Sequence, residues 1–294
     1  MKHRGKRFLG LEPNLRLPIV FFLCFCFFLA GLFGSMIISQ DVNRGGSRHR
    51  LLDEFGYEDA DPMFYGETGE SSVSSIPFQV LSWRPRAVYF PNFASAEQCQ
   101  SVIEMAKSKL KPSGLALRKG ETAESTKGTR TSSGAFISAS EDTTGVLEFV
   151  ERKIARATML PRSHGEAFNV LRYEVGQRYI SHYDSFNPAE YGPQQSQRMA
   201  SFLLYLSDVE EGGETMFPYE NGSNMNKGYD YRSCIGLKVR PRQGDGLLFY
   251  SLFPNGTIDK FVTVISQTSL HGSCPVEKGE KWVATKWIRD RKWP

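Results

Sequence analysis

The sequence predicts a mainly β chain with flanking helices (α+β), whose core is a double-stranded β-helix, or jelly roll, behind one N-terminal transmembrane helix. Two observations support this fold class. From about residue 167 onward, short apolar strands alternate with turn residues and no helical pattern intervenes, which is typical of two-sheet β folds. Residues 17–38 form an uncharged run rich in Phe and Leu, and a bilayer requires about 20 such residues.

The N-terminal residues predict an uncleaved signal anchor. Residues 1–16 form a basic head and residues 17–38 form the apolar run. This run exceeds the roughly 7–15 apolar residues of a signal-peptide core and lacks a small-residue cleavage site. The basic head is expected to lie in the cytoplasm. Residues 39–77 are polar and without periodicity, which favours a flexible lumenal stem, and residues 78–294 form the catalytic domain.

Two Asn-x-Ser/Thr triplets supply a second argument for orientation. They begin at Asn221 and Asn255, in polar segments that contain glycine, so both asparagines are expected on surface loops where N-glycosylation is possible. Together with the anchor they predict a single-pass type II membrane protein of the endoplasmic reticulum, with the Golgi as the alternative, and a lumenal catalytic domain.

The cysteines agree with an oxidising compartment. Cys24 and Cys26 lie in the apolar run, whereas Cys99, Cys234 and Cys274 would face the lumen, where disulfides persist. Three pairings are possible. Cys234 with Cys274 is preferred, because both lie in the strand-rich region near the proposed site.

The catalytic domain begins with two strands and two helices. Phe78–Trp83 and Ala87–Phe90 are predicted strands. Ser95 is expected to cap a helix that extends to Leu110, and a second helix is expected from Thr143 to Ala157. The intervening residues 111–134 are rich in Gly, Ser, Thr, Arg and Lys, and a loop of that length is usually functional. Six further strands are predicted at 168–175, 178–183, 199–206, 237–239, 247–250 and 282–288.

The charge distribution argues against a nucleic-acid partner. The formal net charge is +4 over 294 residues, and the basic residues form no stripe interleaved with aromatic residues, as nucleic-acid surfaces do.

The candidate site begins with His182-Tyr183-Asp184. Side chains alternate along a strand, so His182 and Asp184 project together while Tyr183 turns away. His271, in Ser-Leu-His-Gly, can supply a third ligand from a distant strand. Two imidazoles and one carboxylate on one face of a metal form the ligand set of non-haem Fe(II) oxygenases.

Lys281 lies ten residues beyond His271, at the start of the strand pattern Trp-Val-Ala-Thr-Lys-Trp. That pattern would carry the Lys281 ammonium group into the barrel. A buried ammonium group is costly without an anion, so a dicarboxylate co-substrate would satisfy it. An internal acidic partner or an exposed lysine are the structural alternatives.

These motifs resemble the prolyl 4-hydroxylases, which are Fe(II)- and 2-oxoglutarate-dependent dioxygenases, and look closest to the single-chain, membrane-anchored plant and algal type. The resemblance covers about residues 78–290. It is strongest in Arg-Tyr-Glu-Val-Gly-Gln-Arg-Tyr-Ile-Ser-His-Tyr-Asp (172–184), in Gln-Arg-Met-Ala-Ser-Phe-Leu-Leu-Tyr-Leu-Ser-Asp-Val-Glu-Glu-Gly-Gly-Glu-Thr-Met-Phe-Pro (197–218), in Ser-Leu-His-Gly-Ser-Cys-Pro (269–275) and in Lys-Trp-Val-Ala-Thr-Lys-Trp-Ile (281–288).

The resemblance implies a role for each matching position. It implies that proline in proline-rich secretory or cell-wall polypeptides is hydroxylated at C4, with O2 and 2-oxoglutarate consumed, succinate and CO2 released, and L-ascorbate rescuing over-oxidised iron. The catalytic residues would be the iron ligands His182, Asp184 and His271, together with Lys281 on the distal carboxylate of 2-oxoglutarate. The further matches are Tyr173 and Thr215 for 2-oxoglutarate, Trp287 for the pocket wall, and Arg130, Ser132, Tyr179 and Arg198 for the peptide. A framework ion pair is the alternative role for Arg198.

Two features depart from the family pattern. Arg289 stands where family members often carry a histidine that contacts the peptide. Residues 261–267, Phe-Val-Thr-Val-Ile-Ser-Gln, look like an insertion just before the strand of His271. This insertion must loop out, or it would displace the ligand.

Two rival functions fit parts of the sequence. A catalytically inactive relative would keep the fold and bind peptide without turnover, and the insertion before His271 is the reason to consider it. A type II Golgi glycosyltransferase would share the anchor, stem and lumenal domain. Its Asp-x-Asp metal motif occurs at Asp59-Ala60-Asp61, but within the stem and outside any predicted sheet.

Overall fold

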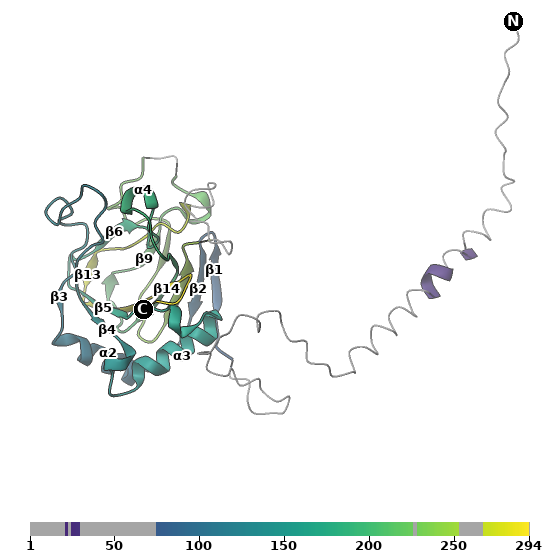
Figure 1. Ribbon diagram of the computed structural model, residues 1–294, viewed down its shortest axis with the longest axis horizontal. Coiled ribbons are helices and arrows are strands. Elements are labelled where there is room, and N and C mark those ends of the chain that lie inside the picture. Colours follow the sequence, from purple (N-terminus) through teal and green to yellow (C-terminus); the bar gives the residue numbers. More distant parts are fainter. Residues whose placement is uncertain (1–20, 23–24, 30–74, 226–227, 253–266, 294) are drawn as a thin grey trace, which may run out of the picture. The chain divides into compact units, whose positions relative to one another are not determined.

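The computed structural model describes residues 21–22, 25–29, 75–225, 228–252 and 267–293 (Figure 1). The chain forms two units, residues 1–58 and residues 59–294. In the first unit the described residues 21–22 and 25–29 are helical. Within the described ranges, no helix combines the length and the apolar character needed to cross a membrane. The basic head and most of the predicted anchor and stem lie outside the described residues.

The second unit is built on two antiparallel sheets. The larger sheet has eight strands, and the smaller one has four and carries both histidines of the candidate site. In spatial order the larger sheet contains β1 (Gln79–Trp83), β2 (Arg86–Phe90), β11 (Gly246–Tyr250), β7 (Arg198–Tyr205), β14 (Lys281–Arg289), β5 (Phe168–Tyr173), β4 (Ser133–Ile137) and β3 (Lys111–Pro112). The smaller sheet contains β10 (Leu237–Val239), β9 (Thr215–Phe217), β12 (His271–Ser273) and β6 (Tyr179–His182), and a separate pair is formed by β13 (Val276–Lys278) and β8 (Glu211–Gly212).

This architecture confirms the mainly β prediction and is consistent with a jelly roll. Two longer helices, α2 (Ala96–Lys107) and α3 (Val146–Thr158), lie together along one side of the strands, while the short α4 (Pro188–Tyr191) lies apart from them (Figure 1). Ser95 caps α2 as predicted: its hydroxyl accepts the N–H of Gln98, whose side chain in turn accepts the N–H of Ser95. Such a capping box satisfies two otherwise unpaired backbone donors.

The apolar core has two parts. Buried side chains of α2 and α3 pack against one face of the larger sheet, on Phe90, Phe168 and Phe202. A second cluster, which includes Tyr173, Tyr205, Phe217 and Phe249, joins strands of the two sheets. The larger sheet therefore has one face against helices and the other toward the smaller sheet.

Strand β14 shows how the sequence pattern positions the site. Trp282, Ala284 and Ile288 join the core on the helical side, so the intervening residues face the smaller sheet. Lys281 is thereby directed into the interior between the sheets. Lys286 follows the same alternation, lies on the helical side and pairs with Glu151 of α3.

Several element boundaries differ from prediction. The 111–134 segment is shortened at both ends because Lys111 pairs with Gly134 and Pro112 with Ser133. The second helix starts at residue 146 rather than 143, because the Asp142 carboxylate accepts backbone N–H groups of Thr144 and Leu147 and turns the chain first. Strands β3, β8, β9, β12 and β13 span only two or three residues each. This is too short for an alternation of apolar and polar side chains to be recognised in the sequence.

Candidate functional site

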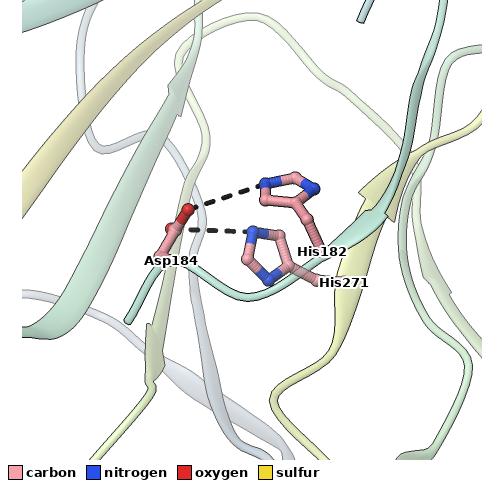
Figure 2. A group of neighbouring side chains, drawn as sticks. All are labelled: His182, Asp184 and His271. Atoms are coloured by element: carbon pink, nitrogen blue, oxygen red, sulfur yellow. Dashed lines mark ion pairs between the residues drawn. The ribbon is translucent and has the colours of Figure 1, made fainter. Parts of the chain in front are cut away.

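His182, Asp184 and His271 converge on one point (Figure 2). His182 ends β6 and His271 begins β12, and the two residues are direct partners in the antiparallel ladder. Asp184 follows two residues after His182. Its Oδ1 lies 3.6 Å from His182 Nε2 and its Oδ2 lies 3.6 Å from His271 Nε2. The possible ligand atoms of the three residues all lie within 4.8 Å of one another.

Hydrogen bonds fix which ring nitrogen each histidine presents. His182 Nδ1 lies 2.9 Å from the carbonyl of Ile180, and His271 Nδ1 lies 3.0 Å from the carbonyl of Ser269. A carbonyl can only accept, so each Nδ1 donates and each Nε2 keeps its lone pair. The Ser201 hydroxyl donates to Oδ2 of Asp184. Supporting contacts of this kind orient ligands before a metal binds.

The charge states also suit a divalent metal. Burial alone would raise the pKa of Asp184, but His271, His182 and Arg198 outweigh burial and hold that pKa well below its usual range. Burial lowers the pKa of His271 to about 4, against the opposing effect of Asp184. The carboxylate is therefore charged and His271 neutral at physiological pH. The set of two imidazoles and one carboxylate fits Fe(II).

Lys281 is buried next to β12, the strand that carries His271. Its side chain is 2% exposed, and its Nζ donates to the Ser273 hydroxyl at 2.9 Å, above the rings of Tyr173 and Tyr205. Burial lowers the pKa of Lys281 to about 7, with Glu214 opposing. Among the described residues no carboxylate forms an ion pair with it. A bound carboxylate would satisfy this ammonium group.

The two other residues proposed for the co-substrate adjoin Lys281. Tyr173 is the ladder partner of Lys281 on β5, and Thr215, on β9, accepts a hydrogen bond from Tyr205 at 2.8 Å. Both are buried. The structure thus brings together all three residues expected to bind 2-oxoglutarate.

A cavity of about 1470 Å³ opens onto the metal centre. His182 and Asp184 lie on its wall, and much of the remaining wall comes from the 113–132 loop, with Phe136 of β4, Tyr191 of α4 and Trp287 of β14. A cavity of that size accepts an extended peptide segment more readily than a single small molecule. We call it the groove.

Comparison with known proteins identifies the family. Residues 168–289 match the family described as the 2OG-Fe(II) oxygenase superfamily. The chain is 71% identical over 293 residues to probable prolyl 4-hydroxylase 9 of Arabidopsis thaliana, covering 99% of each chain. The chain belongs to the prolyl 4-hydroxylase family. Prolyl 4-hydroxylase 13 of the same plant is 57% identical over 288 residues, covering 96% of this chain and 97% of that relative.

A solved structure of lower similarity is the viral collagen prolyl hydroxylase from Paramecium Bursaria Chlorella virus-1. It shares 24% sequence identity, covers 69% of this chain and 95% of its own, and superposes with a TM-score of 0.48. Assignment to the prolyl 4-hydroxylase family comes from the Arabidopsis relatives alone.

Tyr179 is stacked on His182 of the metal centre, and Arg130 is stacked on Tyr179 in turn. The Tyr179 ring lies parallel to His182, with 3.6 Å between centroids. The Arg130 guanidinium lies 4.7 Å from the centre of the Tyr179 ring, and its Nε donates to the buried Ser132 hydroxyl at 3.3 Å. Arg130 and Tyr179 also form a β-bridge. The end of the 113–132 loop is therefore tied to the strand of His182.

Arg198 takes the framework position that the sequence left as an alternative. Its Nε and one Nη donate to the two oxygens of Glu166 at 2.7 and 2.8 Å. Its guanidinium also lies 3.6 Å from the centre of the Trp287 ring on the groove wall. The Trp287 Nε1 is buried and has no hydrogen-bond partner among the described residues. Arg198 thus combines an ion pair with contact to the wall.

Arg289, the family departure, completes the same cluster. Its Nε donates to Glu166 at 2.8 Å and one Nη donates to the Ser196 carbonyl at 2.8 Å. Glu166 therefore serves two arginines. The sequence analysis missed Glu166, although an ion pair was foreseen for Arg198. The one available signal was an acidic residue two positions before the predicted strand at 168.

Cys234 and Cys274 form a disulfide with 5.4 Å between Cα atoms, which is the pair preferred from the sequence. Cys99 is free and buried, and burial raises the pKa of its thiol to about 11. Asn221 is exposed, on the turn Glu220–Gly222. Asn255 and the Asp59–Asp61 motif lie outside the described residues.

The suspected insertion does not displace the metal ligand. Of residues 261–267, only Gln267 is described. Just after it, His271 lies opposite His182 and within reach of Asp184. An inactive relative was considered because the insertion could displace His271, and His271 is not displaced.

Proposed function

We propose that this protein is a prolyl 4-hydroxylase that hydroxylates C4 of peptidyl proline in proline-rich secretory or cell-wall polypeptides. O2 and 2-oxoglutarate are consumed, and succinate and CO2 are released. The observation that carries the proposal is the convergence of His182, Asp184 and His271, with the buried Lys281 ammonium bonded to Ser273 of the strand of His271. Identity of 71% to a protein named probable prolyl 4-hydroxylase 9 supports it.

The residues divide into metal and co-substrate groups. His182, Asp184 and His271 would hold Fe(II). Lys281 would pair with the distal carboxylate of 2-oxoglutarate, and Tyr173 and Thr215 would hydrogen-bond that co-substrate. Bound iron supplies the oxidative chemistry that couples decarboxylation of the 2-oxo acid to hydroxylation. The chain itself sets the geometry and lowers access of water.

The peptide would lie in the groove. A polyproline II segment is preordered and carries apolar pyrrolidine rings, so aromatic walls bind it at little entropic cost. Tyr179 and Trp287 supply such walls, with Arg130, Ser132 and Arg198 as their polar neighbours. The 113–132 loop would close over the peptide and exclude solvent during turnover.

The setting in the cell and one further cofactor belong to the same proposal. We infer a type II membrane protein of the endoplasmic reticulum or Golgi, anchored by residues 17–38 and glycosylated at Asn221 and Asn255. The uncharged run, the two sequence triplets and a disulfide typical of oxidising compartments support this setting. L-ascorbate would restore iron that becomes over-oxidised.

The deciding experiment supplies Fe(II), 2-oxoglutarate, ascorbate and O2 with a panel of proline-rich peptides. Succinate formation and the gain of one oxygen per modified proline, followed by amino-acid analysis for 4-hydroxyproline, would establish the reaction. Peptide binding without succinate would instead support an inactive, binding-only relative. Hydrolysis of a sugar nucleotide with Mn²⁺ would support the glycosyltransferase alternative.

A further inference from the structure

A second segment, residues 228–236, reaches the groove in addition to the 113–132 loop. Its sequence is Gly-Tyr-Asp-Tyr-Arg-Ser-Cys-Ile-Gly. Tyr231 lies on the groove wall with Arg130 and His182, and its side chain remains 47% exposed. A large aromatic ring that stays half exposed beside a catalytic cavity is available to a ligand.

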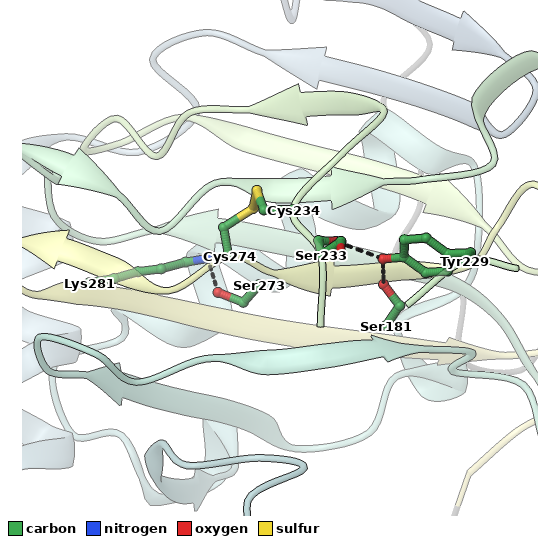
Figure 3. Close-up of a disulfide and its surroundings, with 7 residues drawn as sticks. All are labelled: Ser181, Tyr229, Ser233, Cys234, Ser273, Cys274 and Lys281. Atoms are coloured by element: carbon green, nitrogen blue, oxygen red, sulfur yellow. Dashed lines mark hydrogen bonds between the residues drawn. A yellow bond between two sulfur atoms is a disulfide. The ribbon is translucent and has the colours of Figure 1, made fainter. Parts of the chain in front are cut away.

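The segment is hydrogen-bonded to the strand that carries the first metal ligand (Figure 3). The carbonyl of Tyr231 accepts the N–H of Ser181 at 3.0 Å. The Tyr229 hydroxyl lies 2.9 Å from the Ser181 hydroxyl and donates to the Ser233 carbonyl at 2.8 Å, so it accepts from Ser181. Ser181 directly precedes His182. The position of Tyr231 is thus set relative to the metal centre.

The pairing of β6 with β12 leaves room for this contact. The register between the two strands shifts between His271 and Ser273, and the N–H of Ser181 bonds to the 228–236 segment. Gly272 lies in the same interval, where a Cβ atom would come within 3.0 Å of the Tyr179 carbonyl oxygen and 3.2 Å of the Ser181 nitrogen. At this irregularity the two strands approach each other closely, and the Ser181 N–H bonds to the Tyr231 carbonyl.

The C-terminal end of the segment is fixed independently. Cys234 is joined by the disulfide to Cys274, which follows β12 directly. Gly236 has φ of 86°, and a Cβ atom there would lie 2.2 Å from the Phe217 carbonyl oxygen of β9. The Tyr229 and Tyr231 rings are in contact, with 5.4 Å between centroids. An exposed ring is therefore carried on a backbone that is held at both ends.

We propose that Tyr231 is a peptide-binding residue, the subsite for a residue flanking the target proline, and that the Cys234–Cys274 disulfide positions it. The inference rests on the proposed function and extends it to a residue to which the family resemblance assigned no role. A preordered aromatic ring binds a prolyl ring or an extended backbone mainly through its face, and it loses little entropy on binding.

The primary test compares Tyr231→Ala with Tyr231→Phe in the Fe(II)-loaded enzyme, on a proline-rich peptide of about ten residues. Tyr231→Ala is expected to raise the peptide KM about tenfold. Tyr231→Phe should retain the wild-type KM, because the ring face is kept. The kcat and the KM for 2-oxoglutarate should change by less than about twofold in both. Trp83→Ala, an exposed aromatic residue on β1 away from the groove, is the matched control.

A second arm tests the positioning by the disulfide. Cys234→Ala should raise the peptide KM, and combining it with Tyr231→Ala should add nothing further, because both changes remove the same contact. An unchanged peptide KM in Tyr231→Ala would overturn the inference. So would an equal rise in the KM for 2-oxoglutarate, since that would indicate a general structural defect.

Calorimetric titration of the same peptide separates this inference from the proposed function. Wild-type protein that binds the peptide but forms no succinate would overturn the prolyl 4-hydroxylase proposal. The affinities of the Tyr231 variants would still decide the subsite. Weaker binding in Tyr231→Ala alone would support it, and equal affinities would refute it.

Discussion

Asp184 carries the negative charge of the metal centre, and each of its oxygens faces a different imidazole. Asp184→Asn keeps the shape of the side chain but removes its charge and one acceptor. We expect this variant to lose Fe(II) binding and turnover by more than about a hundredfold, because the remaining imidazoles are neutral donors. Metal content after dialysis and succinate formation measure the two losses.

Ser201→Ala is the matched control for that prediction. It removes only the hydroxyl that donates to Asp184, and loss of such a supporting contact costs about tenfold to a hundredfold in metal affinity. Near-normal turnover in Asp184→Asn would contradict the assignment of this carboxylate as a ligand. A loss in Ser201→Ala as large as in Asp184→Asn would mean that orientation, rather than charge, is decisive.

Lys281 should make 2-oxoglutarate binding dependent on pH. Its pKa is lowered from 10.5 to about 7 by burial, so the free protein loses this proton as the pH rises through 7. A bound carboxylate favours the charged ammonium group, and the complex therefore keeps the proton to higher pH. Binding then takes up a proton, and the Kd should rise by up to about tenfold per pH unit between pH 7 and 9.

Calorimetric titration with 2-oxoglutarate in the absence of O2, so that no turnover occurs, measures this dependence. Lys281→Arg is the control, because a guanidinium group stays protonated throughout the range. Its Kd is expected not to change with pH. A wild-type Kd that is equally flat would show that Lys281 remains charged before the co-substrate binds.

At the scale of elements, β14 carries a positively charged side chain on each of its two faces, and each side chain pairs with a different glutamate. Arg289 shares Glu166 with Arg198 beside the groove, whereas Lys286 pairs with Glu151 on the helical side. We expect Arg289→His, which restores the residue common in the family, to raise the peptide KM several-fold while the KM for 2-oxoglutarate is unchanged. In this variant Glu166 would no longer accept a hydrogen bond from Arg289 and would bind Arg198 alone. The Arg198 guanidinium would then shift, and its stacking on Trp287 in the groove would change.

The cost in stability should be modest, because Glu166 keeps both hydrogen bonds from Arg198. We expect the free energy of unfolding to fall by about 1–2 kcal/mol, measured by denaturant titration. Lys286→Met is the control from the opposite face of the strand. It should lower stability without altering the peptide KM, and a change in the peptide KM there would show that any disturbance of β14 reaches the groove.

The elements also show what the sequence could predict. Alternation along β14 was enough to direct Lys281 inward, and Ser95 as an N-cap was enough to place the start of α2. The ligand spacing in His182-Tyr183-Asp184 indicated a shared face. Each of these features depends on neighbours within a few residues.

Other features depend on distant partners and could not be predicted. Strand β12 has three residues and is a strand because it pairs with β6 on one side and β9 on the other. The first two residues of strand β4, Ser-Gly, lay within the predicted 111–134 loop, because the formation of this strand depends on pairing with β5. Glu166 bonds to residues 32 and 123 positions away. No local pattern encodes partners at that separation.

At the scale of the whole molecule, the described contacts of the metal centre and groove all lie within residues 59–294. The anchor proposed at 17–38 is separate in sequence from every one of them. Removing residues 1–38 is therefore expected to release the protein from membranes and to leave kcat and both KM values within about twofold of those of the full chain, because an anchor of about 20 apolar residues confers attachment rather than catalysis.

Fractionation of cells that express the full chain and the shortened chain tests this attachment. The shortened chain needs a cleavable secretory signal, so that both forms enter the same compartment. In the full chain, a glycosidase should shift the electrophoretic mobility, and Asn221→Gln with Asn255→Gln should remove that shift. Protease added to sealed vesicles should spare the catalytic domain if it is lumenal. A full chain that stays in the soluble fraction would refute the anchor. A catalytic domain that is digested in sealed vesicles, or that carries no glycan, would refute the lumenal orientation, because glycans are added only on the lumenal side.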